Sequence, residues 1–241
     1  MTSFRELWAP RWLYEDAHYL AVEVTFDRDA VRRWVPWPLR VPPVATGTLF
    51  TAWFPHTAFG SVYREAGLLV DVAHGFSGRA VFSPWMIVDD DVALVAGREL
   101  LGYPKKLGAI RFSIDDDRIE AVATRRDAPL VRMSGTLGPV IASPPPMLGR
   151  PHRNVRTSMG IAMPKLVAFT PEERVREARD VDLTVEIGGS PRDPLHILGM
   201  VPGRARLYRV DLGARTLAAI PRPVAPVSPA WLLRHLFVRT H

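Results

Sequence analysis

The sequence predicts a β-rich α+β protein with barrel-like or sandwich closure of its strands and a few peripheral helices. Three observations lead to this fold class. Many short segments carry the apolar patterns of strands, and few segments carry a helical period. The strongest linker-like stretch, residues 143–146, has strand patterns on both sides. Residues 1–241 are therefore predicted to form a single domain.

The N-terminal part of the chain alternates strand-like and turn-like segments. Residues 18–26 alternate apolar and other side chains, which indicates a half-buried strand. Asp27 is the expected N-cap of a short helix that Pro36 ends, and the prolines that follow predict an extended connector. Residues 48–54 and 68–72 are further expected strands.

The middle of the chain combines a buried strand with a further helix. Residues 80–88 are nearly all apolar, and Pro84 indicates a bulge or a sheet edge within this strand. The run 89–91 of three aspartates is interpreted as a solvated turn that caps the next helix, because the alternating ligands and glycine bend of a calcium site are missing. This helix is expected to end at Gly102, before Pro104. Its expected apolar face consists of Val92, Val95, Ala96 and Leu100.

The second half of the chain is again dominated by strand patterns. A helical turn is expected over residues 172–178. The C-terminal segment from Ser228 is amphipathic and begins with an N-cap and a proline, so it is expected to pack as a terminal helix or at a subunit interface. The expected strands are residues 109–114, 119–124, 130–137, 155–169, 181–187, 196–201 and 206–212.

Composition and charge exclude several function classes. The net charge of +6 comes from arginines that are spread along the chain, so no nucleic-acid partner is expected. No apolar run reaches the roughly 18 residues of a membrane span, and the N-terminus does not resemble a signal peptide. We therefore expect no membrane partner and take a cytoplasmic location as the default.

The sequence offers no conventional metal, nucleotide or hydrolase motif. Without cysteine, disulfides and thiolate sites are excluded, and the seven histidines form no zinc-binding spacing. The G-x-G-x-x-G, Walker and G-x-S-x-G patterns are missing. We therefore expect neither a metal nor a cofactor.

Lysine usage singles out one stretch of the chain. Of the 31 basic residues only three are lysines, and two of them, Lys105 and Lys106, are adjacent in an apolar run. Arginine stays protonated in proteins, whereas a desolvated lysine can act as an amine nucleophile. The alternative interpretation is a surface lysine pair after a helix. The scarcity of lysine favours catalysis.

The stretch Gly97-Arg98-Glu99-Leu100, followed by Tyr103-Pro104-Lys105-Lys106-Leu107-Gly108, closely resembles the active-site motif of the acetoacetate decarboxylase family. A weaker resemblance covers residues 19–39 and the element Tyr63-Arg64-Glu65. The resemblance implies a closed or cone-shaped antiparallel β-barrel with peripheral helices. It also implies a homo-oligomeric lyase that acts on a small keto acid.

The resemblance assigns roles to three residues. Lys105 is expected to form a Schiff base with the substrate ketone, Lys106 to help lower its pKa, and Glu65 to transfer protons. Without the resemblance, Glu65 would be interpreted as a solvated loop acid. Acetoacetate decarboxylase is itself the standard example of a lysine activated by desolvation or by a neighbouring cation.

Physical chemistry limits what the lysine neighbour can do. For the neutral amine to be abundant near pH 7, the ordinary lysine pKa of about 10.4 must fall by ~4, which costs ~5 kcal/mol. Adjacent side chains of an extended segment point to opposite faces, so repulsion from Lys106 is not sufficient and desolvation must supply a large part. Tyr103 is expected to line the same cavity as Lys105. The expected apolar wall of this cavity comes from the 80–88 strand and consists of Phe82, Trp85, Met86 and Ile87.

Two departures from the family pattern leave the reaction open. Ala17 stands where the family decarboxylases have an arginine, and Phe50, expected to contact the substrate, stands where they have a first glutamate. Decarboxylation of an acetoacetate-like β-keto acid is the default expectation. The alternatives are aldol, dehydration or cyclisation chemistry on a larger oxo-acid through the same imine, or a non-catalytic ligand-binding barrel. Three arginines are candidates to replace the missing one: Arg28, Arg64 and Arg98.

Overall fold

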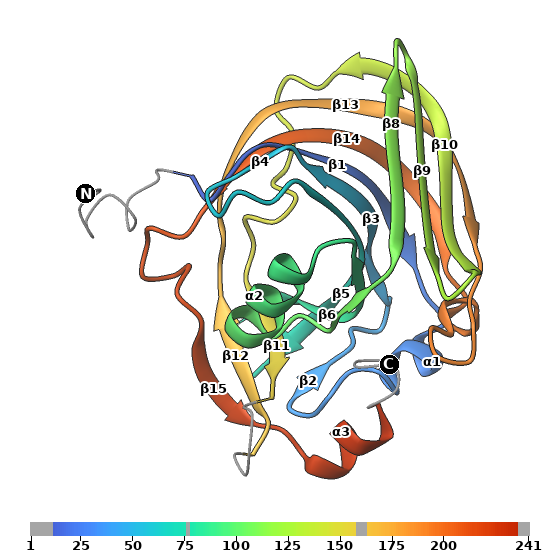
Figure 1. The fold of residues 1–241 in the computed structure, drawn as a ribbon. Coiled ribbons are helices and arrows are strands. Elements are labelled where there is room, and N and C mark those ends of the chain that lie inside the picture. Colours follow the sequence, from blue (N-terminus) through green and yellow to red (C-terminus); the bar gives the residue numbers. More distant parts are fainter. Residues whose placement is uncertain (1–11, 76–77, 158–162, 236–241) are drawn as a thin grey trace.

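The computed structural model describes residues 12–75, 78–157 and 163–235. These residues form a large, strongly curved β-sheet with few helices (Figure 1), which confirms the β-rich fold class. The fifteen strands are β1 (Tyr14–Thr25), β2 (Leu39–Arg40), β3 (Thr46–Phe54), β4 (His56–Thr57), β5 (Tyr63–His74), β6 (Arg79–Val88), β7 (Lys105–Leu107), β8 (Ala109–Asp115), β9 (Arg118–Arg125), β10 (Ala128–Val140), β11 (His152–Arg156), β12 (Lys165–Phe169), β13 (Glu172–Ile187), β14 (Val201–Gly213) and β15 (Arg222–Pro226). The helices are α1 (Arg28–Arg32), α2 (Asp91–Leu101), α3 (Pro229–Arg234) and the 3-10 helix η1 (Leu195–Leu198).

The sheet is mostly antiparallel and open. Its strands follow the order β15-β12-β11-β6-β5-β3-β1-β14-β13-β10-β9-β8, and β2, β4 and β7 pair beside this path. Among the described strands, the only parallel pairings are those of β6 with β7 and with β11. The end strands β15 and β8 do not pair with each other in the described part of the chain, so the closed barrel implied by the resemblance is not found.

Buried side chains form two clusters, and the alternation of side chains along the strands sends neighbouring residues into different clusters. We call one set of packed residues the Trp85 cluster and the other the Tyr103 cluster. The Trp85 cluster includes Leu20, Val22, Phe82, Trp85 and Ile87. The Tyr103 cluster includes Ala17, Tyr19, Ala21, Phe50 and Tyr103.

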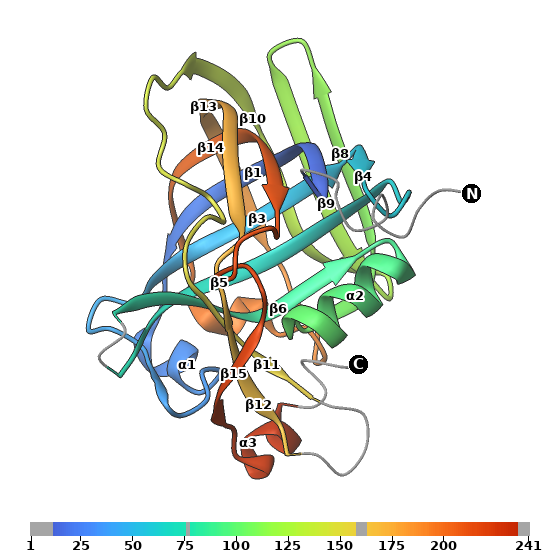
Figure 2. The ribbon, with the colours of Figure 1, turned by 90° about the vertical axis from the view of Figure 1, so that its left-hand side faces the viewer.

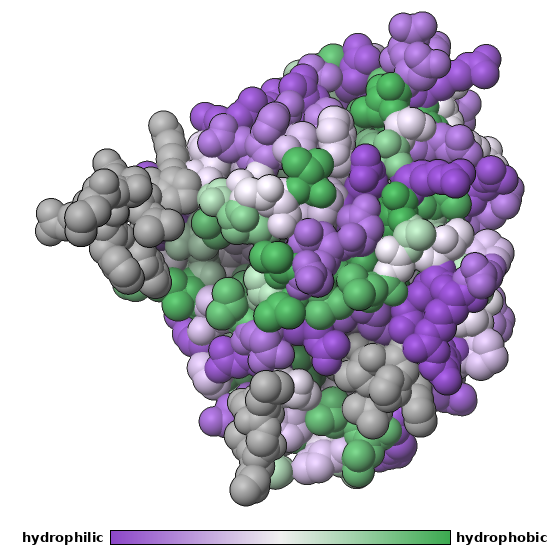
Figure 3. Space-filling view, in the orientation of Figure 1, coloured by the Kyte–Doolittle hydropathy of each residue, from purple (hydrophilic) through white to green (hydrophobic). Residues whose placement is uncertain are grey.

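Helix α2 has the expected ends but not the expected apolar face. Asp90 caps its N-terminus by accepting a hydrogen bond from the Ala93 N–H at 2.7 Å, and Gly102 ends it with a φ of 68°. Its buried residues are the small Ala93 and Gly97, whereas Val95 is 55% exposed. Helix α2 lies along β6 (Figure 2) and also packs against β7 and β11. Figure 3, in the orientation of Figure 1, shows hydrophobic residues exposed among hydrophilic ones on that face of the molecule.

Two local predictions are wrong for tertiary reasons. The expected helical turn over residues 172–178 lies within strand β13, where pairing with β14 overrides the helical pattern. The expected strand over 196–201 is mostly the 3-10 helix η1, which begins after Pro194 and ends at Gly199 with a φ of 57°. No helix in the described ranges is long and apolar enough to cross a membrane.

A bulge near the start of β1 sets which side chains face the Tyr103 cluster. Asp16 has a φ of 54°, and the pairing of β1 with β14 shifts between Tyr14 and Ala17. The extra residue lets Tyr14 and Ala17 both pack on the Tyr103 side, although they are three positions apart.

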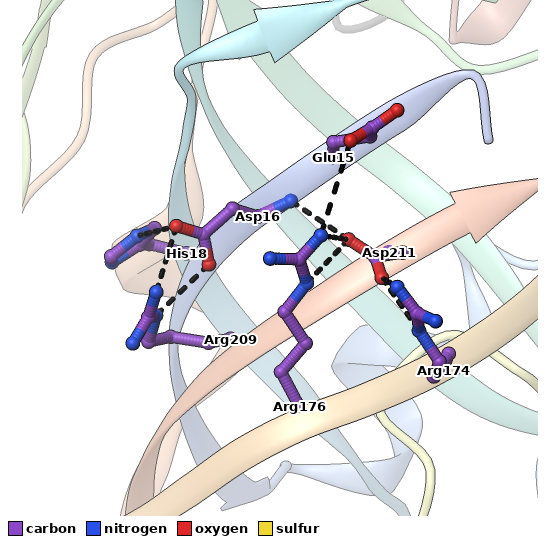
Figure 4. A network of polar contacts seen from close by, with 7 residues as sticks. All are labelled: Glu15, Asp16, His18, Arg174, Arg176, Arg209 and Asp211. Atoms are coloured by element: carbon purple, nitrogen blue, oxygen red, sulfur yellow. Dashed lines mark hydrogen bonds and ion pairs between the residues drawn. The ribbon is translucent and has the colours of Figure 1, made fainter.

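A polar network holds this bulge in place (Figure 4). The Asp16 N–H donates to Asp211 Oδ1 at 2.9 Å. The buried Asp211 carboxylate also accepts hydrogen bonds from the guanidinium groups of Arg174 and Arg176. The Asp16 carboxylate in turn accepts two hydrogen bonds from Arg209, at 2.9 and 2.8 Å.

We predict that Asp211→Asn lowers the free energy of unfolding at pH 7 by about 1–3 kcal/mol. Burial raises the pKa of Asp211, but hydrogen bonds from Asp16, Arg174 and Arg176 outweigh burial and hold it below 3.8. Its contribution is therefore complete above pH 3.8 and is lost as the pH falls through the folded-state pKa.

Urea unfolding at pH 7 and below pH 3.8 measures this effect. The exposed pair of Arg132 and Glu120 offers a control, because Glu120→Gln should change stability by at most about 0.5 kcal/mol. An Asp211→Asn variant as stable as the wild type at pH 7 would contradict the role given to this carboxylate.

Candidate active site

Strand β7 directs the two adjacent lysines to opposite faces of the sheet. The chain leaves α2 at Gly102 and enters β7, which pairs in parallel with β6 so that Lys105 lies opposite Met86 and Lys106 opposite Ile87. Met86 belongs to the Tyr103 cluster and Ile87 to the Trp85 cluster. Lys105 is 5% exposed and Lys106 is 2% exposed, so the surface-pair alternative does not describe them.

Lys105 faces Glu65, a buried carboxylate on β5. Lys105 Nζ lies 2.8 Å from Glu65 Oε2 and 5.4 Å from the centre of the Tyr63 ring. Among the described residues, Glu65 is the only ion-pair partner of Lys105. The structure thus brings together the expected nucleophile and the expected proton-transfer residue.

All five tyrosines of the chain lie in or against the Tyr103 cluster. Burial raises the pKa values of Tyr19, Tyr63 and Tyr103 well above 10, so these hydroxyl groups stay protonated at neutral pH. The sequence prediction assigned Tyr103 alone to the site, and Tyr63 appeared only in the element that contains Glu65. The alternation of β1 from Ala17 was a usable signal for Tyr19, because the two residues share a face.

Gly97 of α2 makes room for the aliphatic arm of Lys105. A Cβ atom at Gly97 would lie 2.6 Å from both Cδ and Cε of Lys105. This separation is far below a van der Waals contact, so a larger residue would displace the lysine. Gly97 thus positions Lys105, a role that the sequence did not reveal.

Tyr103 is fixed by His152 on the neighbouring strand β11. Its hydroxyl lies 3.1 Å from His152 Nδ1, and His152 Nε2 lies 3.2 Å from the Leu148 carbonyl oxygen. The carbonyl can only accept, so Nε2 carries the hydrogen and Tyr103 donates to Nδ1. Burial lowers the pKa of His152 to about 3, which keeps the imidazole neutral.

The proline-rich segment at 143–151 closes one side of the Tyr103 cluster. Met147 and Leu148 are buried members of the cluster. Glu173 holds this segment by accepting hydrogen bonds from the backbone N–H groups of Met147, Leu148 and Gly149. Burial raises the pKa of Glu173, and these hydrogen bonds oppose that change.

The structure does not bring Lys106 into this site. Its ammonium group pairs with Asp193, a buried carboxylate on the Trp85 side of the sheet. Asp193 also accepts hydrogen bonds from Arg125 at 3.1 Å and from the Trp85 indole N–H at 2.9 Å. Any electrostatic effect of Lys106 on the pKa of Lys105 therefore acts across the sheet, because the two ammonium groups are not in contact.

The expected apolar wall is only partly on the lysine side. Met86 and Phe50 lie in the Tyr103 cluster, as expected of residues that line the site. Phe82 and Trp85 do not contribute to the wall, because they lie with Ile87 on the opposite face. A bulge at Pro84 appears as a shift in the β5–β6 pairing and changes which side chains of β6 point to each face. The sequence alone did not determine this direction.

Ala17 and Phe50, the two positions at which the resemblance predicts a departure from the family pattern, both face the Tyr103 cluster. They are almost fully buried there and present a methyl group and a phenyl ring to the cluster. Two of the proposed substitute arginines lie elsewhere: Arg28 donates to the Pro42 carbonyl, and Arg64 pairs with Asp89. Within the described residues, no group of three or more potential metal ligands comes together.

We predict that His152 makes the protein sensitive to mild acid. Its folded-state pKa of about 3 lies below the ordinary value of 6.5, so the unfolded chain takes up a proton first as the pH falls. The contribution of His152 to stability is therefore complete above pH 6.5 and falls by at most ~1.4 kcal/mol per pH unit down to about pH 3. Urea unfolding of the wild type and of His152→Gln between pH 7 and pH 4 measures this slope. Equal slopes in both proteins would contradict the prediction.

Comparison with known proteins places this architecture in a family. The family model for acetoacetate decarboxylase matches residues 3–218. Acetoacetate decarboxylase 1 of Mesorhizobium japonicum is 30% identical over 125 residues, which cover 52% of this chain and 49% of that protein. Acetoacetate decarboxylase of Clostridium acetobutylicum is 30% identical over 107 residues, covering 44% of this chain and 43% of that protein. The match thus spans about half the length of these curated relatives.

Solved structures share the fold over most of the chain. The crystal structure of acetoacetate decarboxylase from Legionella pneumophila has a TM-score of 0.75 at 16% identity and covers 90% of this chain and 92% of that chain. The enduracididine biosynthesis enzyme MppR, complexed with pyruvate, has a TM-score of 0.63 at 17% identity and covers 87% of this chain and 90% of that chain. The chain belongs to the acetoacetate decarboxylase family.

Proposed function

We propose that this protein is a Schiff-base-forming lyase that acts on a small keto acid, with the amine of Lys105 as the nucleophile. The observation that carries the proposal is the buried pair of Lys105 and Glu65, 2.8 Å apart, within an aromatic site. Decarboxylation of an acetoacetate-like β-keto acid is the first reaction to test, because the curated relatives bear the name acetoacetate decarboxylase.

The chemistry follows from these two side chains. Glu65 takes a proton from Lys105, and the free amine attacks the ketone carbon to give a carbinolamine. Loss of water, with a proton returned from Glu65, leaves an iminium ion. Its positive nitrogen accepts the electron pair of the bond to the carboxylate, so CO2 leaves and an enamine remains. Protonation at carbon and hydrolysis release the ketone and restore the lysine.

The apolar wall favours decarboxylation, because this step removes the negative charge of the substrate carboxylate. The substrate carboxylate would lie against Phe50, Met86 and the methyl group of Ala17. Such surroundings solvate an anion poorly, and loss of CO2 removes that anion. The protonated hydroxyl group of Tyr19 can donate a hydrogen bond in this site, whereas that of Tyr63 is hydrogen-bonded to Tyr14.

Aldol addition followed by dehydration is a second candidate reaction, because Ala17 and Phe50 are uncharged. Without a charged group at Ala17 or Phe50, the site can accept a second carbonyl compound beside the enamine, which leads to aldol addition and dehydration. MppR, which shares the fold, is described in complex with the condensation product of pyruvate and imidazole 4-carboxaldehyde. Release of CO2 from acetoacetate separates the two reactions.

A cytoplasmic homo-oligomer remains a further proposal, based on the family resemblance. Light scattering coupled to size-exclusion chromatography measures the assembly directly. A monomer at micromolar concentration would contradict it.

We predict that borohydride traps acetoacetate or pyruvate on Lys105. Intact-mass measurement should show an adduct on the wild type, and none on Lys105→Arg, which keeps the charge but cannot form the imine. The exposed Lys165 offers a control, because Lys165→Arg should give the wild-type adduct. An adduct that persists in Lys105→Arg would overturn the proposed function.

We predict that Gly97→Ala slows imine formation by about tenfold or more, because the added methyl group overlaps the arm of Lys105. The measurement is the rate of borohydride trapping, with a urea unfolding curve to verify folding. Val95→Ala, on the exposed side of the same helix, should keep the wild-type rate. A wild-type rate in Gly97→Ala would show that the close approach does not position the lysine.

A further inference from the structure

A cavity of about 640 Å³ lies between the sheet and the proline-rich segment. Strands β1, β3 and β14 contribute Ala21, Thr48 and Tyr208 to its lining, and the segment contributes Met147 and Arg150. This volume is within the range of small-molecule sites, roughly 300–1,000 Å³. The cavity is not used by the chemistry at Lys105 described above.

The cavity borders the same buried cluster as the lysine site. Ala21, Met147 and Tyr208 line the cavity and also belong to the Tyr103 cluster. Met147 is unbranched and adaptable, so the boundary that it forms can adjust to a ligand that extends across it.

Arg150 is held in this cavity as an oriented cation. Its guanidinium donates to the Met147 carbonyl at 3.2 Å, to Asp71 at 3.2 Å and to the Thr48 hydroxyl at 3.0 Å. These contacts use three of its five N–H groups within the described part of the chain, which leaves two for a ligand. The side chain is 30% exposed, so it is both fixed and reachable.

The charge of Arg150 extends to the lysine site. Burial raises the pKa of Tyr103, and the positive charge of Arg150 acts against this rise. Three arginines and two acids line the cavity, and because Arg150 pairs with Asp71 and Arg206 with Glu23, the remaining Arg204 gives a formal charge of +1. The cavity therefore favours an anion, whereas the lysine site itself has a methyl group at Ala17.

We propose that this cavity binds the carboxylate of an extended oxo acid through Arg150, while the ketone carbon of the same molecule reaches Lys105. The proposal rests on imine formation at Lys105. It makes Arg150 the residue that recognises a carboxylate several bonds away from the carbonyl group, and this carboxylate is not the one that decarboxylation would remove at the apolar wall.

Matched pairs of ketones test this proposal by borohydride trapping and intact-mass measurement. The pairs are 4-oxopentanoate with 2-pentanone and 6-oxoheptanoate with 2-heptanone, which share carbon skeletons and differ in the carboxylate. We expect at least one acid to half-saturate the wild type at a concentration about tenfold or more below that of its neutral partner. Arg150→Gln should remove this preference and leave the neutral ketones unchanged. Arg132→Gln, far along the exposed face of β10, should keep it.

Two results would overturn the proposal in distinguishable ways. If the wild type traps neutral ketones as readily as the acids, the carboxylate site is refuted and the imine chemistry stands. If the wild type traps no carbonyl compound at all, the proposed function fails, and this inference fails with it. Should Arg150→Gln not fold, Thr48→Val removes the hydroxyl that orients the guanidinium and should reduce the preference for acids. An unchanged preference in Thr48→Val would then count against the proposal.

Discussion

The two-residue period of an extended strand is the constraint on which this molecule depends. Because β7 sends consecutive side chains to opposite faces, two adjacent lysines enter two separate buried clusters. Each meets its own carboxylate, Glu65 on one side and Asp193 on the other. Burying two charges is costly unless each is paired and hydrogen-bonded, so the sheet must supply both partners from distant parts of the chain.

The two pairs are built for different tasks. Asp193 is satisfied by Lys106, Arg125 and Trp85, which makes a closed structural network. The carboxylate of Glu65 has Lys105 as its only hydrogen-bonding and ion-pair partner among the described residues, in a site with protonated tyrosines and apolar rings. One arrangement anchors β7 against the rest of the sheet, and the other leaves an amine and a carboxylate with few competing partners. Imine chemistry at Lys105 would require both the fixed position of β7 and the reactive pair of Lys105 and Glu65.

Sequence reasoning reached the parts of this arrangement that are encoded locally. The strand periods, the caps of α1 and α2, and the opposite directions of Lys105 and Lys106 follow from neighbouring residues. The pairing of Lys105 with Glu65 was expected only through resemblance to a known motif. Phe82 and Trp85 were misplaced because a bulge changes the phase of β6, whereas the sequence predicted only a bulge or a sheet edge at Pro84 and not the effect on the side chains around it. Asp193 and Arg150 were not anticipated, since their partners lie 87 and 79 residues away.

The close approach of Gly97 to Lys105 has a consequence for how this sequence can change over evolutionary time. A helix position without a side chain is ordinarily free to become alanine, and such a change usually strengthens the helix. Here the missing methyl group is the space that the lysine arm occupies. We therefore expect a lineage that keeps the amine to keep the glycine, and a lineage that loses the amine to be released from both. The two positions, eight residues apart, are expected to change together.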